Sequence, residues 1–163
     1  MAITKEQLDN ILKKHTLWVE NESGGERADL SGANLRGANL SGADLSRAKN
    51  LNLPMACPEE GSFIGFKQCR NSFIVKLEIL SDSLRCSATG RKCRCSKAKV
   101  ISITNLDGTN ANTNAVISKR DPNFIYKVGE TVEVKNFDTN RWNECSTGIH
   151  FFMTRQEAVD YVY

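Results

Sequence analysis

Leucine and alanine recur every five residues in the first third of the chain. Four pentads each carry one alanine and one leucine: Ala28, Leu30, Ala33, Leu35, Ala38, Leu40, Ala43 and Leu45. A step of five residues turns about 500° around an α-helix, so these leucines would form no apolar stripe, and an odd spacing would place alternate leucines on opposite faces of a strand. The spacing therefore predicts a coil with one pentad per side and leucine in its interior. A loop of biased composition is the alternative.

This pattern resembles the pentapeptide-repeat family, whose members fold as a right-handed quadrilateral β-helix with four pentads per coil. The resemblance implies about one coil here, since the fifth pentad, which starts at Ala48, has Asn50 at its leucine position. A single coil leaves both ends open, so we expect a cap, and a homodimer through an open end is a further expectation. Some members mimic DNA with long acidic coils. We do not expect this here, because one coil is short and Asp29 and Asp44 are interspersed with arginines.

A helix is predicted ahead of the repeat. Thr4 followed by Gln7 is typical of a capping box. Apolar and aromatic residues then follow at helical spacing: Leu8, Ile11, Leu12 and His15. His15 is either a packed histidine beside Trp18 or a ligand. The sequence therefore divides into a helical cap at 1–27, a solenoid at 28–53 and a further domain at 54–163.

Residues 54–163 lose the five-residue period and alternate β-branched or aromatic residues with polar turns. The predicted strands are 63–66, 73–79, 99–103, 124–127, 131–134 and 149–152. A polar loop is expected at 107–114, and Thr154 with Glu157 predicts a short helix at the end of the sequence. Connections this short leave no room for crossover helices. The sequence therefore predicts an α+β domain with mostly antiparallel strands.

The layout as a whole resembles small phage and prophage proteins, through the segments SATGRKCRC, RWNEC and GIHFF. This resemblance implies a phage or prophage origin and the same architecture, and it carries no active site with it. Nothing near Met1 is typical of a signal peptide, and no stretch is apolar enough for a membrane helix. A cytoplasmic location, with no membrane contact, is therefore expected.

Charge and cysteine content point to candidate sites in parts of the chain and do not alter the predicted fold. The formal net charge is +3, but residues 85–99 hold six basic side chains and no acidic one. Six cysteines in a chain that is not expected to be exported are free thiols or metal ligands. Four residues form a candidate zinc set: Cys93, Cys95, Cys145 and His150. The alternative is structural thiols, because C-x-C in a strand points both sulfurs to one face.

Residues 148–161 resemble the strand-then-helix signature of ADP-ribosyltransferases. His150 stands where that family has a tyrosine that stacks on nicotinamide, and the catalytic glutamate of that family has no counterpart before Tyr163. The resemblance therefore implies no catalytic residue, although a nucleotide or ADP-ribose pocket that uses His150, Trp142 and Arg91 is the alternative function. An amphipathic strand and helix that close a sheet is the structural alternative.

The basic segment 85–99 is a candidate binding surface, and a solvated charged face is the alternative. Arg91, Lys92 and Arg94 are expected to meet an anionic partner, a host protein first and nucleic acid or a nucleotide second. Trp142 and Asn143 are candidates for the same surface. The preferred hypothesis is a non-enzymatic interaction protein that binds a host macromolecule through 54–163, for example to inhibit host defence.

Overall fold

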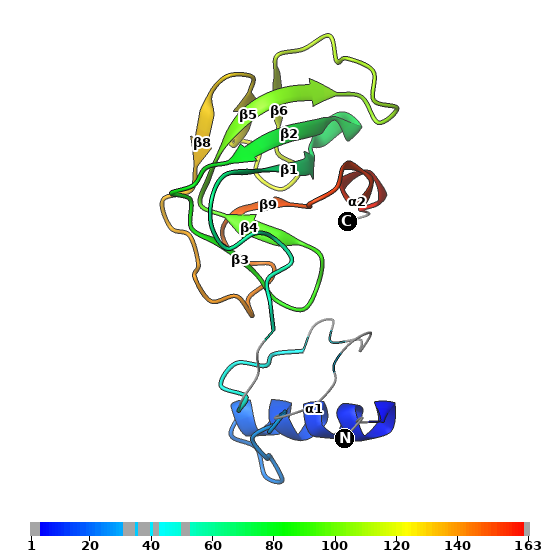
Figure 1. Ribbon diagram of the computed structural model, residues 1–163, viewed down its shortest axis with the longest axis vertical. Helices are drawn as coiled ribbons and strands as arrows, with labels where there is room; N and C mark the ends of the chain where they lie inside the picture. The colour runs from blue at the N-terminus through cyan, green and yellow to red at the C-terminus, as the bar shows by residue number, and fades with distance from the viewer. Residues whose placement is uncertain (1–3, 31–34, 36–39, 41–42, 50–52, 162–163) are drawn as a thin grey trace. The chain divides into compact units, whose positions relative to one another are not determined.

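The computed structural model describes residues 4–30, 35, 40, 43–49 and 53–161. They belong to two compact units, Met1–Pro54 and Met55–Tyr163, which are described separately below (Figure 1). Ala33 and Ala38 of the predicted repeat core lie outside the described residues. No helix found in the described residues has the length and apolar composition needed to cross a membrane.

Helix α1, Lys5–Val19, begins where the capping box predicted. The Thr4 side chain accepts from the Gln7 amide, and the Gln7 side chain accepts from the Thr4 amide, so two free donors of the first turn are satisfied. Leu8 and His15 are the buried residues of the helix. The predicted N-terminal helix is confirmed.

His15 connects α1 to two separate parts of the repeat. Its Nδ1 accepts from the Ala28 amide at 3.2 Å, and its Nε2 lies 3.1 Å from the carbonyl oxygen of Ser46, to which it donates. The ring also stacks on Trp18, with centroids 5.5 Å apart. Of the two interpretations of His15, the packed histidine is confirmed.

The described repeat residues share a buried interior. Ala28, Leu30, Leu40 and Leu45 are buried, and Leu35 and Ala43 are partly buried. Asp29 forms a parallel bridge with Lys49, and the Lys49 amide donates to the Ala28 carbonyl at 2.9 Å. The chain therefore returns beside its own start after four pentads.

The second unit contains a four-stranded antiparallel sheet with the order β1-β2-β5-β8 (Figure 1). Its strands are β1 Phe63–Gln68, β2 Ile74–Ile79, β5 Lys97–Thr104 and β8 Thr131–Glu133. Apolar residues alternate with polar ones over most of β2 and β5, which suits one buried and one solvated face. The four corresponding sequence predictions are confirmed.

A second sheet has the order β3-β4-β9, and a hairpin pairs β6 with β7. Their bounds are β3 Arg85–Ser87, β4 Cys93–Cys95, β9 Ile149–Phe151, β6 Ala115–Ile117 and β7 Ile125–Lys127. The strands β7 and β9 were predicted, whereas β3, β4 and β6 were not. All paired strands are antiparallel in the part of the chain that the structure describes, so the α+β prediction is confirmed.

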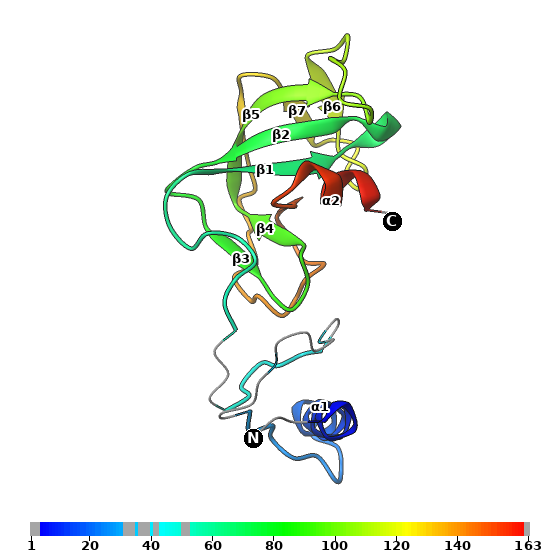
Figure 2. The same ribbon diagram turned by 45° about the vertical axis from the view of Figure 1, so that its right-hand side comes forward.

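One apolar core joins the two sheets and the hairpin. It takes Leu77 and Val100 from the large sheet, Cys93 and Phe151 from the small one, and Tyr126 from the hairpin. Helix α2, Arg155–Asp160, begins at its predicted capping box and lies beside β1, as Figure 2 shows. The helix closes a smaller cluster in which Ala158 packs with Ile74 and Phe152.

Candidate site: a basic pocket between the small sheet and the hairpin

The register of β4 against β9 sorts their side chains onto two faces. The pairs across the ladder are Cys93 with Phe151, Arg94 with His150, and Cys95 with Ile149. Because side chains alternate along a strand, both cysteines share the core face, and Arg94 and His150 share the opposite face. The two faces therefore have different chemistry.

This register separates the candidate zinc ligands. Cys93 and Cys95 are fully buried, His150 faces the other way, and Cys145 is exposed with its sulfur 3.3 Å from the Lys92 ammonium. Burial raises the pKa of Cys95 to about 12. Within the described ranges, no group of three or more His, Cys, Asp and Glu side chains is placed to hold a metal ion. The structure does not bring these four residues together, and Cys93 and Cys95 pack as core thiols.

Arg94 holds the loop that connects β8 to β9. Only 2% of this residue is exposed. Its guanidinium donates to the carbonyl oxygens of Asp138 at 2.9 Å, Asn140 at 2.9 Å and Thr147 at 2.8 Å. A guanidinium is suited to bind three carbonyl oxygens at once, because its N–H donors lie in one rigid plane and point in different directions. Arg94 therefore shapes a loop and is not exposed to an external partner.

Glu144 fixes the same loop at a second point. Its Oε1 accepts from the amides of Thr89 and Gly90, both at 3.1 Å, and from the Thr89 hydroxyl at 3.2 Å. The amides of Thr89 and Gly90 therefore bind an internal carboxylate. Charge-assisted bonds of this kind are stronger than neutral ones, so the loop is held firmly against β4.

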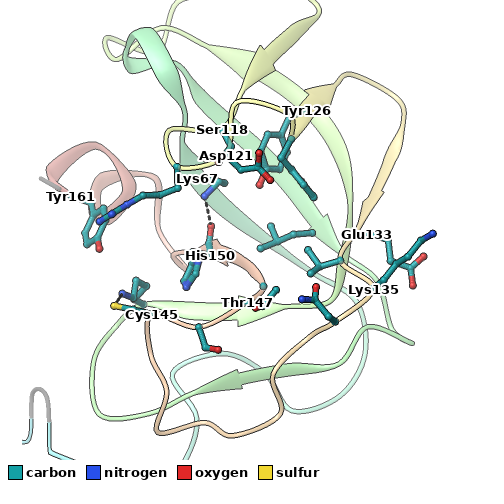
Figure 3. Close-up of a pocket in the computed structure, with 18 residues that line it drawn as sticks. Lys67, Ser118, Asp121, Tyr126, Glu133, Lys135, Cys145, Thr147, His150 and Tyr161 are labelled. Carbon is teal, nitrogen blue, oxygen red and sulfur yellow. Dashed lines mark hydrogen bonds between the residues drawn. The ribbon is translucent and has the colours of Figure 1, made fainter.

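The loop and the β6–β7 hairpin enclose a pocket of about 680 Å³ (Figure 3). Four cationic side chains line it: Lys67, Lys92, Arg120 and Lys135. Two acidic side chains, Asp121 and Glu133, and three aromatic ones, Phe124, Tyr126 and Tyr161, complete its charged and aromatic lining. Pockets that bind small molecules have volumes of roughly 300–1,000 Å³ and a similar mixture of aromatic and polar groups.

Lys67 is the most deeply placed cation of the pocket. Only 6% of the residue is exposed, and its Nζ donates to the carbonyl oxygen of His150 at 3.3 Å (Figure 3). The ammonium lies 5.9 Å from the centroid of the Tyr126 ring. Burial lowers the pKa of Lys67, because removing an ammonium from water disfavours its charged form. Lys67 is therefore a buried amine whose charged form is disfavoured by its surroundings.

His150 is neutral at physiological pH. Burial, followed by the charges of Lys67 and Lys92, lowers its pKa to about 4. Its Nε2 lies 3.1 Å from the Glu144 carbonyl oxygen. A carbonyl oxygen only accepts, so Nε2 carries the proton and Nδ1 remains an acceptor. The pocket thus contains one neutral imidazole among its cations.

The structure brings together two of the six residues predicted to bind a partner. Lys92 and His150 line the pocket. Four others are not among its lining residues: Arg91, Arg94, Trp142 and Asn143. Arg91 is exposed and forms an ion pair with Glu157 at 2.6 Å, and Trp142 is partly buried with the Arg141 guanidinium 5.4 Å from its ring.

The sequence analysis missed most of the pocket. Lys67 follows the predicted strand 63–66 by one residue, and the real strand continues to Gln68. Continued alternation would have placed Gly65, Lys67 and Cys69 on one inward face, and all three are buried. A lysine at an inward strand position is the signal that identifies the site. The lining from 118–136 carries no such signal, because it lies mostly in turns.

Two family models match the chain. Residues 53–158 match the Family of unknown function (DUF5758), and residues 26–49 match Pentapeptide repeats (8 copies). The latter match supports the resemblance drawn from the leucine spacing. The former contains nearly all of the second unit and every lining residue of the pocket except Tyr161.

A viral protein is similar to part of the chain. Uncharacterized protein L223 of Acanthamoeba polyphaga mimivirus is 43% identical over 72 residues, which are 43% of this chain and 46% of the relative. The chain thus matches about half the length of this relative. No solved structure matches the chain. Since the DUF5758 model spans well over half of the sequence, the chain belongs to the Family of unknown function (DUF5758).

Proposed function

We propose that the second unit binds a small anionic ligand with an aromatic ring, of the nucleotide or ADP-ribose class, in the pocket between the small sheet and the β6–β7 hairpin. The observation that carries this proposal is the deeply buried amine of Lys67, beside three further basic side chains, in a pocket of about 680 Å³. Burial without an anion disfavours the charged form of a basic group, and an anionic ligand would offset that cost.

The lining supports a ligand with both charge and a ring. The cations outnumber the acids by four to two, and His150 adds no negative charge. Phosphate groups bind well to converging lysine and arginine side chains. Phe124, Tyr126 and Tyr161 offer ring faces and edges on which a planar base can stack. These features favour nucleotides over neutral sugars or purely apolar ligands.

Thermal unfolding with and without ligand tests this proposal. We expect ADP-ribose or AMP to raise Tm by several degrees, since a ligand at a hundred times its Kd adds about 2.7 kcal/mol. Adenosine, which lacks the phosphate, should raise it much less. Lys135→Gln removes an exposed cation of the pocket and should reduce the rise in Tm. Lys99→Gln changes an exposed lysine outside the pocket lining and should leave the rise in Tm unchanged. Equal shifts with adenosine and AMP, or none with any of these ligands, would contradict the proposal.

For the first unit we propose about one coil of right-handed quadrilateral β-helix, capped by α1. The parallel bridge between Asp29 and Lys49 supports it, because twenty residues separate these positions and a coil of four pentads has that length. The buried leucines at 30, 40 and 45 support it as well. Such a short coil serves as a scaffold or a self-association element.

The mimivirus relative supports the proposal of a viral setting for this chain. A role against host defence, a host macromolecule as partner, a homodimer and a cytoplasmic location all stay predictions. The basic segment offers such a partner two exposed cations, Lys99 and Arg91, and Arg91 would exchange its ion pair with Glu157 for the partner.

A further inference from the structure

Lys67 has fewer polar contacts than its buried position requires. An ammonium offers three donors, and the hydrogen bond that Lys67 makes is a long one of 3.3 Å to the carbonyl oxygen of His150. None of the ion pairs among the described residues includes Lys67. An arginine at this depth, Arg94, is bound by three carbonyl oxygens. Lys67 therefore presents its amine to the pocket without comparable neutralising contacts.

The surroundings of Lys67 favour its neutral amine. Burial lowers its pKa most, and the positive charges of Lys119 and Lys92 lower it further. Negative thiolates nearby would raise it, but burial itself raises the pKa of Cys69 to about 11 and that of Cys95 to about 12. Both thiols are thus neutral near pH 7 and supply no counter-charge. A neutral amine has a free electron pair, which an ammonium lacks.

We propose that Lys67 is a nucleophilic amine that forms an imine with the aldehyde or ketone group of an anionic ligand in this pocket. The inference rests on the proposed function, because Lys92, Arg120 and Lys135 are the groups that would hold the ligand's anionic part. It narrows the ligand class to anions that carry a carbonyl group. It also gives Lys67 a chemical role that a merely structural lysine would not have.

The step needs no reagent beyond the ligand. The electron pair of Nζ attacks the carbonyl carbon, and the π electrons of the C=O bond move to oxygen. The two protons of the neutral amine end on that oxygen, which leaves as water while a C=N bond forms. The reaction reverses when water attacks the imine, so the ligand is held covalently and reversibly.

Pyridoxal 5′-phosphate is a suitable probe, because it combines a phosphate, an aromatic ring and an aldehyde. The full chain is incubated with it near pH 7, treated with sodium borohydride, which reduces an imine to a stable amine, and mapped by peptide mass spectrometry. We expect about one adduct per chain, on Lys67. Adducts confined to exposed lysines such as Lys99, with none on Lys67, would overturn the proposal. This mapping uses the unaltered sequence, so it does not depend on whether a variant folds.

Lys67→Met is the matched variant, because it keeps a long unbranched side chain, adds no buried charge and has no amine that could form the imine. It should lose the adduct, whereas Lys99→Met should keep it in full. Between pH 7 and 9 the rate of adduct formation at exposed lysines rises about a hundredfold with their neutral fraction, and the rate at Lys67 should rise much less. An equally steep rise at Lys67 would also overturn the proposal.

Pyridoxine 5′-phosphate, the alcohol that cannot form an imine, separates this inference from the proposed function. Suppose that pyridoxine 5′-phosphate binds and competes with ADP-ribose, but pyridoxal 5′-phosphate leaves no adduct on Lys67. The proposed ligand site is then supported, and the proposed imine is wrong. If neither the alcohol, the aldehyde nor ADP-ribose binds, the proposed function itself is wrong.

Discussion

Arg94 and Lys67 are two buried basic residues with different surroundings. Arg94 is surrounded by three carbonyl oxygens and stabilises the loop before β9. Lys67 has one such contact and lines the pocket. The difference follows from the geometry of the two side chains. The planar guanidinium of Arg94 donates to several fixed carbonyl oxygens at once, whereas the amine of Lys67, on a flexible stem, can adjust to a bound ligand. His150 lies between them, paired with Arg94 across the ladder and bonded through its carbonyl to Lys67.

His150 should make the stability of the second unit depend on pH. Its pKa falls from 6.5 in the unfolded chain to about 4 in the folded one. Its contribution is therefore fully present above pH 6.5 and is lost as the pH falls towards 4, because only the unfolded chain takes up a proton there. The loss is about 3 kcal/mol at most. The measurement is the free energy of unfolding in urea at several pH values.

The His150→Gln variant isolates this contribution, because carboxylates titrate alike in both proteins and cancel in the difference. The difference in free energy of unfolding between the unaltered chain and the variant should shrink as the pH falls from 6.5 to 4. A difference that stays constant over this interval would show that His150 is not held neutral by its surroundings.

At the level of elements, the sequence predicted the strands that show apolar–polar alternation and the helices that begin at a capping box. The six long or apolar strands and both capping boxes were found, because β-branched alternation and the Thr-x-x-Gln/Glu pattern are local signals. Strands β3 and β4 were missed because they consist of arginine, cysteine and serine, without β-branched or aromatic residues, and β6 was missed although it is as long as β7, β8 and β9, which were found. In β4, Arg94 is buried by carbonyl groups that lie 44 to 53 residues further along the chain. The basic segment was therefore predicted to be an exposed surface, and most of the pocket lining, formed by distant turns, gave no local pattern.

Gly65 of β1 tests how tightly the two sheets pack. A Cβ at this position would lie 2.6 Å from Cδ2 of Phe151, whose ring is fully buried. Gly65→Ala should therefore lower the free energy of unfolding by about 1–3 kcal/mol, as is usual when a packed core is overfilled. Gly90→Ala is the control, since its Cβ would meet nothing closer than 3.6 Å. The two variants are compared by chemical denaturation, and equal stabilities would contradict close packing of β1 on β9.

At the scale of the whole molecule, the candidate pocket lies within one of the two compact units. Every residue that lines the pocket lies in Met55–Tyr163, and the DUF5758 match covers 53–158. The first unit has its own interior, built from α1 and the buried repeat residues. We therefore expect the second unit to hold the ligand and the repeat to contribute no residue to that site.

Amide chemical shifts of the full chain during titration with ADP-ribose test the central claim most directly. We predict saturable shifts that cluster at Lys67, Cys145, Gly148 and His150, with residues 4–30 unchanged. Saturable shifts confined to residues outside the pocket lining, or no saturable shift at all, would contradict a ligand site in this pocket.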